Sequence, residues 1–268
     1  MAVLLLWIYL PTLLKLVSQW WHDPNFSHGF FVPLFSAFVL WENRKSLLAL
    51  SPKPSWGGLI VLAAGLFTVV VGILGAELFL SRLSLLLVIA GLLIYFFGWS
   101  YMRAVFFPWA FLLLMIPLPS IVFNQITLPL QLLASRCASF ALPLLGVPVL
   151  RQGNVIVLPA MALEVAEACS GIRSLLSLIT LAIIYGYFLE KRMWVRVVLA
   201  LAAIPLAIVA NSLRIVGTGL LVQYWDPSKA EGFFHAFSGW LIFVVSLLML
   251  YLLHRFIERF LPGKEQAP

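Results

Sequence analysis

Charged side chains are scarce in this sequence of 268 residues, where Asp, Glu, Lys and Arg together make up 10%. A soluble domain carries roughly 25% charged and about 45–50% apolar residues, whereas this chain is 63% hydrophobic and has a mean hydropathy of +1.07. The shortage of charge excludes a water-soluble core. The apolar residues form blocks of the about 20 residues that a helix needs to cross a bilayer. We therefore predict an all-α polytopic membrane protein, with a single domain over residues 1–268.

Cysteine is scarce too, and the two residues of this type, Cys137 and Cys169, stand far apart in the sequence. No Cys-x-x-Cys pair or His/Cys cluster is present, so we predict no metal and no other cofactor. Two cysteines can form one disulfide, and a Cys137–Cys169 bond remains open as an alternative. The first apolar block, residues 1–17, has neither a basic start nor a small-residue cleavage site, which favours a retained first helix over a signal peptide.

Eight apolar segments predict about eight transmembrane helices, and most of the positive charge falls in four of the connections between and after them. If the N-terminus is cytoplasmic and residues 119–169 stay outside, all four connections are cytoplasmic, as the positive-inside rule requires. Both termini are then cytoplasmic, and the net charge of +7 reflects topology rather than nucleic-acid binding. The predicted helices cover residues 1–20, 29–43, 57–75, 79–98, 104–118, 170–189, 197–220 and 237–256. The four connections hold ten of the 17 basic residues, namely Arg44, Lys45, Lys53, Arg103, Lys191, Arg192, Arg196, Arg255, Arg259 and Lys264.

Residues 119–169 decide the parity of this topology. Residues 121–145 are apolar but contain Arg136 and two prolines, and a crossing here would move the later basic loop to the outside. We therefore predict a helix that lies in, or re-enters, the outer interface. Residues 147–158 carry valines on both sides of a Gln-Gly-Asn turn, which predicts a short β-hairpin outside the hydrocarbon. The segment is thus an outer-face insertion between the fifth and sixth helices.

The sequence around Cys169 ends this insertion and opens the sixth predicted helix. A thiol near a helix N-terminus tends to a lowered pKa and becomes a nucleophilic thiolate. Arg173 follows four residues later, so the two residues would share a helix face. Ser170 is an adjacent hydroxyl that could act in its place. A buried structural cysteine explains Cys169 alone equally well.

Two further polar positions lie where the membrane does not explain them. Arg214 falls in the outer third of the seventh predicted helix, where an arginine needs an anionic partner, a water-filled cavity or a substrate. Asn211 lies on the same side, and an ion pair of Arg214 with Glu164 or Glu167 is the structural alternative. His235 opens the eighth helix, and His can act as acid or base near neutral pH, although a lone interfacial His is more often structural.

The predicted topology brings Cys169, Arg214 and His235 to the same outer face. Together they supply a nucleophile, a cation for an oxyanion and a proton shuttle, which predicts acyl transfer through a thioester. Ser27 and His28, in the first outer loop, are predicted to support this site by binding or structurally, rather than only to anchor the loop in the interface.

At these residues the sequence resembles the exosortase/archaeosortase family of membrane cysteine transpeptidases. The resemblance rests on Ala-Cys-Ser-Gly-Ile-Arg-Ser at residues 168–174, Asn-Ser-Leu-Arg-Ile at residues 211–215 and His235 before the last helix. Ser-His-Gly at residues 27–29 and Pro-Leu-Pro at residues 117–119 also fit, and the order of features covers nearly the whole chain. A His in the third motif resembles the bacterial exosortase branch, since archaeal relatives often carry Arg there.

The resemblance implies a multi-pass enzyme of the bacterial cytoplasmic (inner) membrane, active on the periplasmic face. Cys169 would be the nucleophile, Arg214 the transition-state cation and His235 the acid/base, with Arg173 left open as the essential cation. The partners would be membrane-anchored proteins with a C-terminal sorting signal of the PEP-CTERM type, the lipid bilayer and an unknown acceptor nucleophile. The main alternative is a transporter or lipid-handling protein with a polar outer cavity, which would explain Arg214 without needing Cys169.

Overall fold

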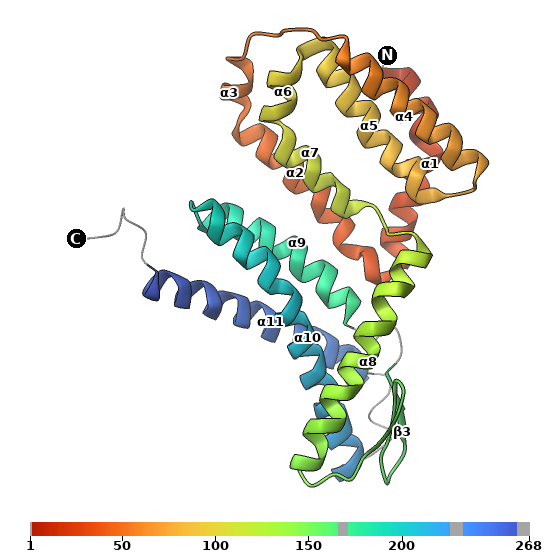
Figure 1. Ribbon diagram of the computed structural model, residues 1–268, viewed down its shortest axis with the longest axis vertical. Helices are drawn as coiled ribbons and strands as arrows, with labels where there is room; N and C mark the ends of the chain where they lie inside the picture. The colour runs from red at the N-terminus through yellow and green to blue at the C-terminus, as the bar shows by residue number, and fades with distance from the viewer. Residues whose placement is uncertain (1, 166–170, 226–232, 262–268) are drawn as a thin grey trace. The chain divides into compact units, whose positions relative to one another are not determined.

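The computed structural model describes residues 2–165, 171–225 and 233–261 (Figure 1). The described chain is mostly helical with one small antiparallel sheet, so the predicted fold class is confirmed. It divides into two compact units, Met1–Val122 and Phe123–Pro268.

The first unit is built around a hairpin of two long helices, α4 and α5. Gly58, Gly65 and Gly72 recur every seven residues on α4, and a Cβ at any of them would lie within 3 Å of α5 atoms; at Gly65 it would lie 2.8 Å from Val88. Small residues of this kind let two membrane helices approach closely. The elements of this unit are α1 (Ala2–His22), η1 (Pro24–Phe30), α2 (Phe31–Glu42), α3 (Arg44–Leu48), α4 (Gly57–Leu74), α5 (Leu78–Phe97), α6 (Trp99–Ala104), α7 (Phe106–Phe111) and η2 (Leu112–Met115).

The second unit contains all but the first turn of α8 (Ser120–Leu144), a three-stranded sheet and three further helices. The helices α9 (Ile172–Leu189), α10 (Met193–Tyr224) and α11 (Phe233–Phe260) follow one another as neighbours in space. Their shared core combines large aliphatic side chains with alanines, which keep α10 close to α9. The buried residues of this core are Leu175, Leu178, Ala182, Val195, Leu199, Ala203, Ala207, Leu250 and Ile257.

The sheet contains the predicted hairpin and one strand more. Strands β1 (Leu150–Gln152) and β2 (Val155–Val157) pair antiparallel around a two-residue turn, in which Gly153 has a φ of +64°. A type II′ turn needs a positive φ at this position, so the hairpin prediction is confirmed. The third strand, β3 (Ala162–Glu164), pairs with β2. It was not predicted because Ala-Leu-Glu has no strand pattern of its own, and its pairing with β2 creates it.

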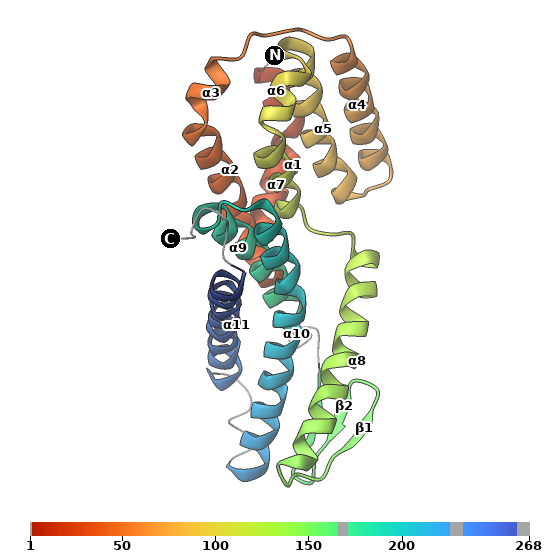
Figure 2. The ribbon, with the colours of Figure 1, turned by 60° about the vertical axis from the view of Figure 1, so that its left-hand side comes forward.

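The sheet lies against the C-terminal halves of α8 and α10 (Figures 1 and 2). The fully buried Ile156 of β2 packs with Leu142 of α8 and Val222 of α10. The hydroxyl of Ser135 on α8 donates to the Gly153 carbonyl oxygen over 2.9 Å. Because β3 belongs to this packed layer, the chain that leads from β3 to Cys169 starts from a fixed position.

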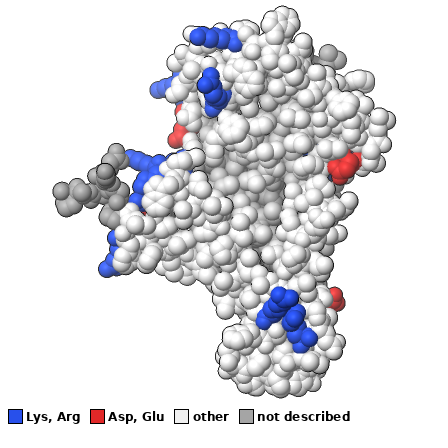
Figure 3. Space-filling model, viewed as in Figure 1, with Lys and Arg blue, Asp and Glu red and all other residues white. Residues whose placement is uncertain are grey.

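The prediction of about eight spans is not confirmed. Among the described residues, five helices are long and apolar enough to cross a membrane, or six if 106–115 and α8 form one broken span. The predicted span 29–43 is α2, whose 12 residues extend about 18 Å, short of the roughly 30 Å hydrocarbon layer. Most of the face shown in Figure 3 is uncharged, as expected for a membrane protein. The five candidate spans are Gly57–Leu74, Leu78–Phe97, Ile172–Leu189, Met193–Tyr224 and Phe237–Phe260.

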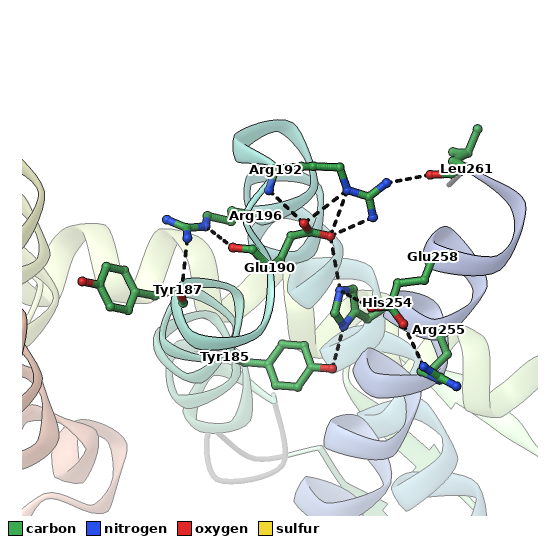
Figure 4. Close-up of polar contacts among 9 residues, drawn as sticks. All are labelled: Tyr185, Tyr187, Glu190, Arg192, Arg196, His254, Arg255, Glu258 and Leu261. Carbon is green, nitrogen blue, oxygen red and sulfur yellow. Dashed lines mark hydrogen bonds and ion pairs between the residues drawn. The ribbon is translucent and has the colours of Figure 1, made fainter. Parts of the chain in front are cut away.

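A buried carboxylate ties together the helix ends on the other side of the second unit (Figure 4). Glu190, at the end of α9, is 7% exposed. Arg192 donates to it from its backbone N–H over 2.8 Å and from Nη2 over 2.8 Å, and His254 Nε2 of α11 lies 3.5 Å away. Arg192 Nη1 also donates to the Leu261 carbonyl oxygen over 2.6 Å. The turn between α9 and α10 is thereby fixed to the end of α11.

The Arg192 hydrogen bonds, which outweigh the effect of burial, hold the pKa of Glu190 at about 2. A carboxyl in an unfolded chain titrates near 4.3. Since the folded pKa is the lower one, the carboxylate stabilises the fold above about pH 4.3, and this stabilisation is lost as the pH falls toward 2.

Replacing Glu190 by Gln keeps the shape but removes the charge, and we expect a loss of about 1.5–3 kcal/mol of unfolding free energy near pH 7. The measurement is thermal denaturation of the detergent-solubilised protein at pH 7 and pH 3, where the difference from the wild type should shrink. Glu258→Gln is the control, because Glu258 is more exposed, at 32%, and pairs with the exposed Arg255. Equal effects of the two substitutions at pH 7 would contradict this account.

Candidate functional site

Only part of the predicted site lies within the described residues. Cys169, Ser170 and Glu167 belong to residues 166–170, which lie outside them. His235 belongs to the first turn of α11, and its side chain also lies outside the described part. The predicted site residues that the structure describes in full are Arg173, Asn211, Arg214, Ser27 and His28.

The start of α9 is set by a glycine in a left-handed conformation. Gly171 has a φ of +82° and caps the helix, whose first residue is Ile172. A right-handed helix cannot continue backward through such a residue. The helix therefore begins two residues later than predicted, after Cys169. The expectation that Cys169 and Arg173 share a helix face stays a prediction, because Cys169 lies outside the described residues.

Gly171 rests directly on Asn211 of α10. A Cβ added at Gly171 would lie 3.0 Å from both Cβ and Cγ of Asn211, and Asn211 is only 2% exposed. Any side chain at residue 171 would therefore push the two helices apart. The contact brings the end of the Cys-Ser-Gly motif against the beginning of the Asn-x-x-Arg motif.

One turn further along α10, Arg214 reaches α11. Its Nε donates to the hydroxyl of Ser238 over 3.1 Å, and a Cβ at Gly239 would lie 4.0 Å from its Cζ and Nη2. Ser238 and Gly239 follow His235 in sequence by three and four residues. Arg214 is half-buried at this contact. The described contacts thus join the start of α9, the middle of α10 and the first turns of α11.

The distance of Arg214 from the start of α10 is close to the thickness of a bilayer. Arg214 follows Met193, the first residue of α10, by 21 residues, which is about 31 Å of helix and close to the roughly 30 Å thickness of the hydrocarbon. Beyond Arg214, Ile215 and Val222 pack in the core that includes the sheet. The C-terminal part of α10 is thus covered by the sheet and α8.

Arg173 and Cys137 lie on helices other than α10, which carries Arg214. The side chain of Arg173 is exposed on the first turn of α9. Cys137, on α8, is a free cysteine. Among the residues that the structure describes, no group of three or more His, Cys, Asp and Glu could hold a metal ion.

Ser27 and His28 belong to η1 in the first unit and do not face the same way. His28 is buried, and its Nε2 lies 3.2 Å from the Leu114 carbonyl oxygen of η2. Burial lowers the pKa of His28, and the bond to Leu114 opposes this shift. Ser27 is exposed and donates to the Pro24 carbonyl oxygen within its own turn over 3.2 Å. These contacts are structural, and a supporting role of the two residues in the site stays a prediction.

The close contact between Gly29 and Trp20 explains why the Ser-His-Gly motif ends in a glycine. A Cβ at Gly29 would lie 2.6 Å from Cδ1 of the buried Trp20. The Trp20 indole N–H in turn donates to the Met115 carbonyl oxygen over 2.9 Å. Trp20 and His28 thus bind two consecutive carbonyl groups at the end of η2, next to the Pro-Leu-Pro turn.

The sequence profile of the family described as Transmembrane exosortase (Exosortase_EpsH) matches residues 20–252. The chain belongs to the transmembrane exosortase family. The matched range includes every residue of the site described above, and membership implies a membrane enzyme that processes sorting signals. No curated protein and no solved structure matches the chain.

The sequence motifs did not identify Ser238, Gly239 and Gly171 as residues that join the helices. For Ser238 and Gly239, the only sequence feature that pointed to a role was their position one turn after His235. The packing role of Gly171 was equally hidden, because it depends on which residue of α10 lies opposite.

Replacing Gly171 by Ala should impair activity far more than insertion or folding. The methyl group would meet Asn211, and the positive φ would strain the backbone. A displacement of about 1 Å at a reactive group can lower the rate on the order of 10²-fold. The assay is cleavage of a substrate with a C-terminal sorting signal in cells, with membrane abundance measured by immunoblot.

Gly153→Ala is the matched control, since Gly153 also has a positive φ but has open space around its Cβ position. It should retain most of the cleavage activity. Wild-type cleavage by Gly171→Ala, or equal losses in the two variants, would show that the contact with Asn211 does not shape the site.

Proposed function

We propose that the chain is a cysteine transpeptidase that cleaves a C-terminal sorting signal of the PEP-CTERM type and transfers the protein to an acceptor. The observation that carries the proposal is the pair of contacts Gly171–Asn211 and Arg214–Ser238. They join the three helix segments whose sequences carry the candidate nucleophile, cation and acid/base.

The nucleophile of this proposal is Cys169, two residues before the cap of α9. An 18-residue helix follows, and the dipole at its N-terminus favours a thiolate over a thiol. The cap residue is Gly171, which has no side chain to accept a hydrogen bond from the first turn. This end of α9 therefore suits the binding of an external negative charge.

The cation of the proposal is Arg214 rather than Arg173. Arg214 is half-buried and its Nε is held by Ser238, which fixes the plane of the guanidinium group. A fixed guanidinium presents its donors in one geometry, as stabilisation of a developing oxyanion requires. Arg173 is exposed, so the charge that it contributes is more strongly screened.

The reaction proceeds in two steps. The Cys169 thiolate attacks the carbonyl carbon of the scissile peptide bond, and Arg214 stabilises the resulting oxyanion or binds the acidic residue of the sorting motif. The C–N bond then breaks, His235 donates a proton to the leaving amine and a thioester remains. An acceptor amine or hydroxyl, deprotonated by His235, attacks the thioester, and the thiolate leaves as the product forms.

The choice between the two arginines gives the test. We expect Arg214→Gln to lower substrate cleavage by about 10²–10³-fold, the usual cost of losing an oxyanion donor, with unchanged membrane abundance. Arg173→Gln is the matched control and should retain most activity, whereas Cys169→Ala sets the level of no activity. The measurement is the ratio of cleaved to uncleaved substrate in cells.

Cleavage by Cys169→Ala at the wild-type level would contradict the proposed mechanism. It would favour a non-enzymatic membrane protein, such as a transporter or lipid-handling protein. A greater loss in Arg173→Gln than in Arg214→Gln would assign the cation to Arg173.

A further inference from the structure

A cavity of about 620 Å³ lies in the first unit, between the last turns of α1 and the first turns of α5. Two basic side chains line it, Lys15 from α1 and Arg82 from α5, together with His22 and Asp23 at the end of α1. None of these residues belongs to the site proposed for cleavage.

Arg82 is the unusual member of this cavity, because two nitrogens of its buried guanidinium group have no hydrogen-bond acceptor among the described residues. It is 3% exposed and lies in the second turn of a candidate membrane span. Among the described residues, none accepts a hydrogen bond from its Nε or Nη2. An unpaired buried charge costs several kcal/mol, roughly the cost of placing Arg within a membrane. An anion from outside the described chain would supply acceptors for these two nitrogens.

Glu77 attracts Arg82 electrostatically, but neither it nor Asp23 accepts a hydrogen bond from Nε or Nη2 of Arg82. Glu77 caps α5, where its Oε2 accepts a hydrogen bond from the Leu80 N–H over 3.1 Å. Asp23, which lines the cavity, accepts a hydrogen bond from the Asn25 N–H over 2.9 Å. Each carboxylate is thus engaged in ending or starting a helix. The cavity is lined by two cationic side chains, Lys15 and Arg82, and by one carboxylate, Asp23. This excess of one positive charge matches the single negative charge of a phosphodiester.

The position of the cavity favours a phosphate group carried by a lipid. Leu14 and Leu78 line it as well, and they are 62% and 41% exposed, so acyl chains would find apolar contacts there. Leu78 is the first residue of α5, and Arg82 lies about 6 Å further along the axis, near the level of the headgroups. We propose that this cavity binds the phosphate group of an anionic phospholipid, with Arg82 and Lys15 as its ligands.

The test uses the full-length protein in detergent, depleted of lipid, and follows thermal denaturation and lipid adducts in native mass spectrometry. Dioleoylphosphatidylglycerol should raise the melting temperature and form an adduct, and dioleoylphosphatidylcholine should do so less. Inorganic phosphate should have little effect if the lipid is the source of the phosphate. An equal response to millimolar inorganic phosphate would support a phosphate site but assign it to the free ion.

Arg82→Met should weaken phosphatidylglycerol binding by about 10–100-fold, the value of a charge-assisted hydrogen bond of 1.5–3 kcal/mol. It should also raise the melting temperature in lipid-free detergent, because it removes a buried charge with two nitrogens that lack an acceptor among the described residues. A purely structural arginine would do the opposite. Lys15→Gln changes an exposed side chain, so it tests the site even if Arg82→Met misfolds.

Arg103→Gln is the control for general charge, since Arg103 is an exposed residue of α6 in the same unit. It should bind phosphatidylglycerol as the wild type does. Unchanged phosphatidylglycerol binding in both Arg82→Met and Lys15→Gln would overturn the proposal, and so would equal weakening in Arg103→Gln.

Discussion

Removing a polar group from water without a partner is costly, and in a bilayer this constraint acts on every side chain of a spanning helix. The second unit meets it by pairing its polar groups between helices. Glu190 is held by Arg192, Arg214 is held by Ser238 and Asn211 is covered by Gly171. These contacts lie at the two ends of the bundle formed by α9, α10 and α11. The apolar core between them needs only close packing, which its alanines allow.

The two ends of this bundle serve different purposes. At the Glu190 end the carboxylate and the Arg192 guanidinium group neutralise one another and stabilise the turn and the end of α11. At the Arg214 end the guanidinium group donates a hydrogen bond to the neutral hydroxyl of Ser238. A guanidinium group that is oriented by a hydrogen bond suits transition-state stabilisation. The difference supports the proposed site at the start of α9.

Sequence patterns predicted the features that depend on local chemistry. The Gly-Asn turn and its flanking valines identified the hairpin. The polar residues of three motifs identified the family to which the chain belongs. The features that were not predicted depend on tertiary contacts. Strand β3 exists through its pairing with β2, and the start of α9 depends on the left-handed Gly171. The count of eight spans was not confirmed, and α2 is shorter than predicted, because apolar composition does not reveal where a helix ends.

The central claim is that Cys169 carries the acyl group during sorting. Its most direct test is mass spectrometry of the membrane-embedded protein after reaction with a substrate bearing a sorting signal, quenched at low pH to preserve thioesters. The account predicts a substrate fragment attached to Cys169, released by neutral hydroxylamine and absent from Cys169→Ala. A fragment attached to Ser170 or to any other residue, with Cys169 unmodified or in a disulfide with Cys137, would contradict it.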